Sequence, residues 1–248
     1  MQYNCPNCNQ VVDGNFCSNC GQRKYKRIDR KYIWDEIQYT VLHTNKGFLY
    51  SIKNLIKNPG KTAREYLEGK RVNHYKPILL VFVLSGISAF ISFKIVGLNE
   101  IVREIYSTNE AMDSDFLNES LSFSASYTSL MMVFFIPFLA LFSKIAFRKW
   151  GHNYYEHVIM NAYILSVHTL FDIIISLPAI YIVKNTIGVF GALPFLSFCI
   201  VPFILVWFYK GLYKDKSIKS IIARVLLILL MILIGYIILT ITVSLFIN

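Results

Sequence analysis

Five long apolar runs follow the first 77 residues of this 248-residue chain, and they constrain its fold more than any other feature. They cover roughly residues 78–98, 129–147, 157–183, 188–209 and 221–246. A helix of about 20 apolar residues spans a bilayer, because each residue adds about 1.5 Å against about 30 Å of hydrocarbon. Backbone polar groups in lipid must be paired within the protein, so the runs are expected to be helical. The chain is therefore predicted to be an all-α polytopic membrane protein with five transmembrane helices.

The charges of the connecting segments favour one orientation. Residues 1–77 contain 14 Lys or Arg against 6 Asp or Glu, whereas residues 99–128 contain one Arg against six acids. The connections 148–156 and 210–220 are basic again. Lys and Arg remain on the cytoplasmic side during insertion. The first 30 residues hold cysteines and charges instead of an apolar signal segment. The prediction is a multi-pass membrane protein with a cytosolic N-terminus and an extracytoplasmic C-terminus.

Three segments are expected along the chain. Residues 1–22 form a small cysteine-rich unit, and residues 23–77 form a basic tether with amphipathic helices that lie at the cytosolic membrane interface. Asn58-Pro59-Gly60 is expected to break the second segment into two helices. Residues 78–248 form the transmembrane domain.

The N-terminal segment has the cysteine spacing Cys5-x2-Cys8-x8-Cys17-x2-Cys20. Two such pairs supply four thiolates to one ion, which is the ligand set of a structural zinc site. Gly21 follows the second pair, where a positive φ is easily adopted. The spacer is short, so little core is expected beyond Val11, Val12 and Phe16. A compact ribbon that folds around structural Zn²⁺ is predicted.

Other interpretations of the cysteines remain open. An iron–sulfur cluster or a redox-active pair of disulfides uses similar spacing, although reducing cytosol disfavours disulfides. Catalytic zinc is disfavoured because four thiolates leave no open coordination position. The fifth cysteine, Cys199, lies in an apolar run and is interpreted as a small buried hydrophobic side chain.

Basic residues flank the predicted interfacial helices. Anionic lipid headgroups are the expected contacts of six of them: Arg23, Lys24, Lys26, Arg27, Lys70 and Arg71. The simpler alternative is that this run only sets topology and tethers the ribbon. Nucleic-acid binding is a third, less favoured interpretation.

The order of several short motifs resembles an uncharacterised bacterial membrane family, numbered 3667 in the domain-of-unknown-function series. The residues that carry it are Cys5-x2-Cys8, Phe16-Cys17-x2-Cys20-Gly21-Gln22, Asn58-Pro59-Gly60, Tyr66-Leu67-x-Gly69-Lys70-Arg71, Tyr75 and Pro77. The resemblance covers about residues 5–80 and implies an inner-membrane location and a zinc ribbon, but no activity. The architecture is also loosely similar to that of Yip1-type five-span membrane proteins, which says little about function.

Polar residues in the third apolar run form a stripe. His157, Asn161, His168 and Asp172 follow one another at steps of 4, 7 and 4 residues, so they share one helical face. Ionisable groups within a membrane span are candidates for proton or ion paths or for a small-molecule pocket. The simpler interpretation is that the stripe hydrogen-bonds to neighbouring helices.

No sequence motif for catalysis is recognised, so a non-enzymatic protein is expected. The favoured hypothesis is an inner-membrane protein whose zinc ribbon is a cytosolic docking or sensing module. Its partners would be the lipid bilayer and either another protein or a second copy of the chain. The alternatives are a transporter or channel-like protein that uses the stripe, and, more weakly, a membrane-perturbing effector.

Overall fold

The computed structural model of the chain describes residues 3–5, 7–21, 47–71, 73–101, 114–183 and 193–247. The chain divides into two compact units, residues 1–45 and 46–248. Each unit is described by itself.

The N-terminal unit is a short hairpin with a second loop. Strands β1 (Tyr3–Asn4) and β2 (Val11–Val12) pair antiparallel, with Tyr3 opposite Val12. The amide of Cys5 continues this ladder by donating to the carbonyl of Gln10. The hairpin loop therefore contains the first cysteine pair, and residues 17–20 bring the second pair close to it.

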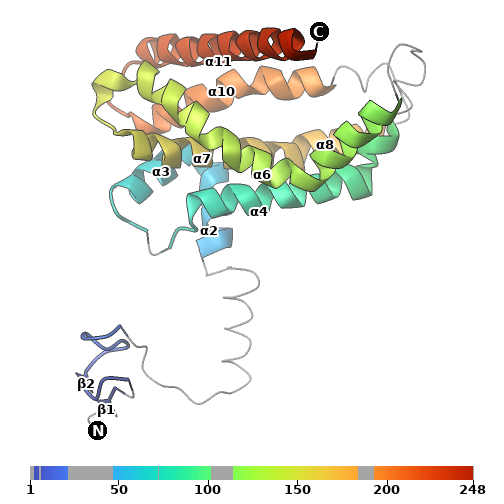
Figure 1. Cartoon of the computed structure of the whole chain (residues 1–248). Coiled ribbons are helices and arrows are strands. Elements are labelled where there is room, and N and C mark those ends of the chain that lie inside the picture. Colours follow the sequence, from blue (N-terminus) through green and yellow to red (C-terminus); the bar gives the residue numbers. More distant parts are fainter. Residues whose placement is uncertain are drawn as a thin grey trace. The chain divides into compact units, whose positions relative to one another are not determined.

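The second unit is helical. Its described elements are α2 (Gly47–Lys57), α3 (Pro59–Leu67), α4 (Pro77–Phe90), η1 (Ile91–Val96), α6 (Ser114–Ala146), η2 (Arg148–Trp150), α7 (Tyr154–Phe171), η3 (Asp172–Ser176), α8 (Leu177–Val183), α10 (Leu193–Leu212) and α11 (Ile218–Ile247). The segments η1 and η3 are π-helical turns that continue α4 and α7, whereas η2 is a single 3₁₀ turn. Helix α7 lies against α4, α6 and α10, and α3 crosses the end of α10 (Figure 1).

Four helices in the described residues are long and apolar enough to cross a membrane. They are Pro77–Val96, Ala125–Ala146, Tyr154–Val183 and Ile218–Thr242. These match the predicted spans 78–98, 129–147, 157–183 and 221–246 and confirm a multi-pass helical architecture. The predicted span 188–209 overlaps α10, but its residues 188–192 lie outside the described residues, and the apolar helix Cys199–Leu212 is shorter than the other four.

Two helices begin earlier than the apolar runs predict. Helix α6 starts at Ser114, within the segment 99–128 that was predicted to connect two spans. No Gly or Pro interrupts residues 114–136, so nothing in this polar stretch ends the helix. Helix α7 starts at Tyr154 because Asn153 and Glu156 form a capping box, in which each side chain binds the other's backbone amide.

The core of this unit is formed where α7 meets α2, α3 and the end of α10. Tyr163 and Met160 of α7, Phe208 of α10 and Leu55 of α2 are fully buried together. Large apolar side chains on the outer faces of the spans, such as Phe134 and Leu226, are exposed. Such exposure is expected of helices that face lipid, which is as apolar as these side chains.

The contact between α3 and α10 is unusually close. A Cβ atom on Gly60 would lie 2.0 Å from the carbonyl oxygen of Phe208 and 2.4 Å from the amide nitrogen of Leu212. Asn58 caps α3 by accepting from the amide of Lys61 at 3.0 Å. The sequence Asn58-Pro59-Gly60 does separate two helices, as predicted, and its glycine also lets two backbones touch.

Candidate functional site

The four cysteines of the N-terminal unit converge on one point. Their sulfur atoms all lie within 4.8 Å of one another. The Sγ atoms of Cys5 and Cys20 are 3.6 Å apart, and those of Cys8 and Cys17 are 3.5 Å apart. Sulfurs about 2.3 Å from a tetrahedral ion are about 3.8 Å apart, whereas a disulfide requires about 2.05 Å. The cysteines are free thiols, and their sulfur atoms are close enough together to hold one metal ion.

The two cysteine pairs have the same local backbone. The amide of Asn9 donates to the carbonyl of Cys5 at 2.8 Å, and the amide of Gly21 donates to that of Cys17 at 2.9 Å. Both donors are left-handed, with φ of 59° and 72°. Asn9 was not predicted for this role, although asparagine tolerates positive φ better than most residues. This matching geometry supports two turns that direct their thiols toward a shared ion.

Apart from the cysteines, few of the described residues of this unit are buried. Val12 packs with Cys5 and Cys17, as predicted, but Val11 is half exposed and Phe16 is 61% exposed. The expectation that Val11 and Phe16 belong to the core is wrong, because the hairpin has only one covered face. The described part of this unit is therefore held together mainly by its strands and cysteines.

The polar stripe of the third span divides into two pairs. His157 and Asn161 are buried, and they contact Ser143 of α6. The Oγ atom of Ser143 lies 3.0 Å from Nδ1 of His157 and accepts from Nδ2 of Asn161 at 2.8 Å. Asn161 also donates to the carbonyl of His157. These contacts are interhelical hydrogen bonds, the simpler of the two interpretations of the stripe.

Replacing Ser143 with alanine is expected to destabilise the membrane unit by about 1–3 kcal/mol, since Nδ1 of His157 loses its partner and Nδ2 of Asn161 loses one of its two acceptors. The midpoint of thermal unfolding in detergent should fall accordingly. Ser166→Ala is the matched control, because Ser166 is equally buried but bonds only to the carbonyl of Ala162 in its own helix. Equal effects of the two substitutions would contradict an interhelical role for Ser143.

The other pair of the stripe is His168 and Asp172. Nδ1 of His168 lies 3.1 Å from Oδ2 of Asp172, and the side chains are 24% and 22% exposed. Asp172 is also the first residue of the π-helical turn η3. Such turns occur frequently at functional sites in helices. This pair is thus partly accessible, whereas His157 and Asn161 are buried.

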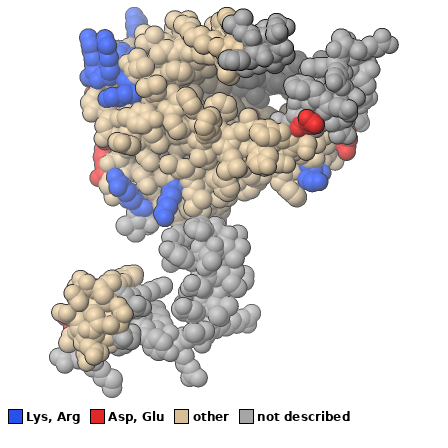
Figure 2. Space-filling view, viewed as in Figure 1, with Lys and Arg blue, Asp and Glu red and all other residues tan. Residues whose placement is uncertain are grey.

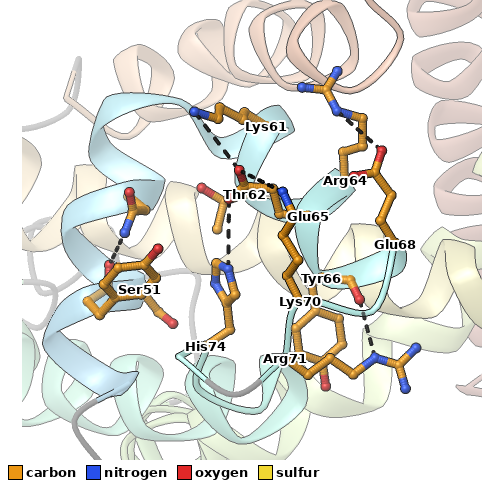
Figure 3. Close-up of polar contacts among 12 residues, drawn as sticks. Ser51, Lys61, Thr62, Arg64, Glu65, Tyr66, Glu68, Lys70, Arg71 and His74 are labelled. Carbon is orange, nitrogen blue, oxygen red and sulfur yellow. Dashed lines mark hydrogen bonds and ion pairs between the residues drawn. The ribbon is translucent and has the colours of Figure 1, made fainter.

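Polar side chains of α3 and the segment after it form a network around Glu65 (Figure 3). Oε1 of Glu65 lies 3.9 Å from Nζ of Lys61 and 3.8 Å from Nζ of Lys70. Nε of Arg71 donates to the carbonyl of Tyr66 at 3.2 Å, and its guanidinium lies over the Tyr66 ring. Lys70 and Arg71 are exposed, so both remain accessible to headgroups. The predicted contacts Arg23, Lys24, Lys26 and Arg27 lie outside the described residues.

His74 is buried beside this network. Its Nε2 lies 4.0 Å from Oε2 of Glu65, and its ring makes edge contacts with Tyr50 and Tyr66. Burial lowers the pKa of His74 below its ordinary value of 6.5, and the Glu65 carboxylate opposes this shift. His74 is therefore neutral at pH 7.

This lowered pKa predicts acid sensitivity. The unfolded chain binds the His74 proton more tightly than the folded chain, so stability is complete above pH 6.5. It falls as the pH drops below 6.5 toward the pKa of the folded state. His74→Phe keeps an aromatic ring between the tyrosines and removes the titration. We expect the unfolding midpoint of the wild type to fall more than that of the variant below pH 6.5, and parallel curves would contradict this.

Comparison with known families identifies one segment of the chain. Residues 45–89 match the family described as Protein of unknown function (DUF3667). They comprise α2, α3, the Glu65 network, His74 and the first 13 residues of α4. No curated protein and no solved structure matches the chain. The likeness to Yip1-type proteins remains a prediction based on architecture. The family expected from the motif order is confirmed over residues 45–89, and in that segment the chain carries the DUF3667 signature.

Proposed function

We propose that the chain is a non-enzymatic inner-membrane protein whose N-terminal unit is a cytosolic docking or sensing module built on structural Zn²⁺. The observation that carries this proposal is the convergence of Cys5, Cys8, Cys17 and Cys20 within 4.8 Å, on two turns of the same geometry. Four thiolates favour zinc over harder cations. They also leave no position for substrate, so the ion supplies folding energy and not catalysis.

The proposed orientation has five spans, with the N-terminus in the cytosol. The distribution of basic groups supports it. Lys and Arg gather at the end of the helical unit where α11 begins (Figure 2). There, Arg64 of α3 donates to the carbonyls of Gly211 and Leu212, and Trp150 of η2 packs on Tyr213. The segments that precede α4, follow α6 and precede α11 thus meet at one end, as the positive-inside rule requires.

A protein partner is proposed for the N-terminal unit because of its exposed apolar side chains. Phe16 and Val11 are exposed, so neither contributes to the core of the hairpin. An exposed phenylalanine lowers the solubility of so small a unit unless another surface covers it. Aromatic side chains are common anchors of protein interfaces. A second copy of the chain is the alternative occupant of this surface.

The test compares partners captured in intact cells. The tagged full-length chain is cross-linked, solubilised in detergent and purified, with Cys5→Ser/Cys17→Ser, Phe16→Ser and Cys199→Ser as variants. We expect both N-terminal variants to lose the same partner and Cys199→Ser to retain it. Because Phe16→Ser leaves the thiols in place, it separates docking from metal binding. An unchanged partner set with unchanged abundance would overturn the docking proposal.

A transporter or channel-like function is the second candidate, and the accessibility of His168 and Asp172 favours it. An imidazole and a carboxylate 3.1 Å apart can exchange a proton within a span. Reconstituted liposomes would compare proton flux of the wild type with that of Asp172→Asn. Proton flux through the wild type that is lost in Asp172→Asn would support a transporter or channel-like function. The absence of flux through both proteins would rule it out.

A further inference from the structure

A hollow of about 500 Å³ lies between the end of α6 and the start of α11. Arg148, Lys149 and Arg224 form its cationic side, and Ile145, Ala223 and Leu227 are among its apolar wall. This volume is within the range of small-molecule sites in proteins. None of the residues assigned above to the metal site, the polar stripe or the expected headgroup contacts lines it.

The three cations have no counter-ion in the part of the chain that the structure describes. No carboxylate lies within 4.0 Å of Arg148, Lys149 or Arg224 there, whereas Arg64, Lys61 and Lys70 all have one. Three positive charges around one hollow repel one another unless an anion joins them. The electrostatics of the hollow therefore favour an anionic ligand.

Arg224 is held in place for such a ligand. Its Nη1 donates to the carbonyl of Ser220 at 3.1 Å and to the Ser220 hydroxyl at 2.6 Å. Its guanidinium carbon lies 4.2 Å from the centre of the Trp150 ring. A planar guanidinium fixed in this way loses little entropy on binding, and arginine suits phosphate oxygens geometrically.

The position of the hollow along the candidate spans indicates which kind of anion it binds. Ile145 and Ala146 are the last residues of one candidate span, and Ala223 and Leu227 lie in the first turns of another. The cations sit beside these ends, which is where the hydrocarbon meets the phosphate layer of a bilayer. We propose that the hollow binds an anionic glycerophospholipid, with its phosphate on Arg148, Lys149 and Arg224 and an acyl chain along Ile145 and Leu227. This proposal requires neither the metal nor the His168 pair.

The test titrates the purified full-length protein in detergent with phosphatidylglycerol, phosphatidylcholine or inorganic phosphate. Native mass spectrometry counts the bound lipid and gives a dissociation constant. We expect phosphatidylglycerol to bind and to raise the unfolding temperature, and phosphatidylcholine and inorganic phosphate to do neither. Arg148→Gln/Lys149→Gln should weaken phosphatidylglycerol binding about thirtyfold, the factor expected for two cations near the headgroups.

Lys214→Gln/Lys219→Gln is the matched control. It removes the same charge from exposed lysines near the start of α11 that do not line the hollow, so binding should change little. Since Arg148 and Lys149 are also exposed, their variant should unfold at the wild-type temperature without lipid. If the double variant unfolds at a lower temperature than the wild type, the single variants Arg148→Gln and Lys149→Gln are tested instead. Each is expected to weaken binding about fivefold. Equal losses in both double variants, equal binding of phosphatidylcholine, or equal binding of inorganic phosphate would each overturn the proposal.

Discussion

Replacing Gly60 with alanine is expected to lower the stability of the membrane unit by more than about 3 kcal/mol, beyond the usual cost of overpacking. The added Cβ would lie 2.0 Å from the carbonyl oxygen of Phe208 and 2.6 Å from the carbonyl carbon of Gly211. These atoms are backbone, so they cannot rotate away as the tip of a side chain would. Helix α3 must separate from α10, and the hydrogen bonds from Arg64 to Gly211 and Leu212 are lost with the contact.

Thermal unfolding in detergent would measure this effect as a fall of the midpoint by at least about 6 °C. Gly235→Ala is the control within a membrane helix, where the new Cβ would meet only the Phe142 ring at an ordinary 3.6 Å. That change should be neutral or stabilising, because alanine is the better helix former. Gly211→Ala should destabilise in the same direction but less, since its Cβ would lie 2.7 Å from Oδ1 of Asn58 and 3.0 Å from the Cα of Gly60. A wild-type midpoint for Gly60→Ala would show that α3 does not sit on α10.

Removal of the metal is the second change with a large expected effect. If zinc is bound as proposed, its binding free energy of about 10–16 kcal/mol is the folding energy of the N-terminal unit. Cys5→Ser or Cys17→Ser, or a strong chelator, should therefore unfold residues 3–21 and make them sensitive to protease. The helical unit should keep its unfolding midpoint, because the two parts are separate compact units.

Elemental analysis of the purified full-length protein would count the metal. One zinc ion per chain is expected in the wild type and in Cys199→Ser, since Cys199 belongs to α10 of the helical unit and is not one of the four clustered cysteines. The loss of bound zinc in Cys5→Ser and Cys17→Ser should coincide with the gain of protease sensitivity. A wild-type chain without metal, or iron and sulfide in its place, would refute the zinc assignment.

The sequence predicts the cysteine cluster and the helical membrane architecture well, because both follow from local rules. The spacing of two cysteine pairs brings four thiols together, and length with hydropathy identifies a helix that can span lipid. The predicted starts of helices α6 and α7 are less accurate, because both helices begin before the apolar runs. Asn153 and Glu156 carry a capping signal at the start of α7, which hydropathy alone does not detect.

The division of the polar stripe could not be predicted from the sequence. Helical spacing places His157, Asn161, His168 and Asp172 on one face, but it does not reveal which neighbour covers each part of that face. Ser143 covers the first two from α6, and a single serine in an apolar run is too common to signal this. Cys199 shows the same limit, since it was interpreted as buried and is exposed. Both outcomes depend on packing between segments distant in sequence.

The tight contact of Gly60 with α10 has a consequence for biogenesis. Arg64 and its acceptor Gly211 are 147 residues apart, so the α3 segment leaves the ribosome long before its binding surface exists. At about 5–20 residues per second the delay is roughly 7–30 s. During that interval residues 59–67 lack the cover that α10 later provides, and nascent chains stalled before residue 211 should expose them to protease. The contact between α3 and α10 therefore forms only after α10 has been made.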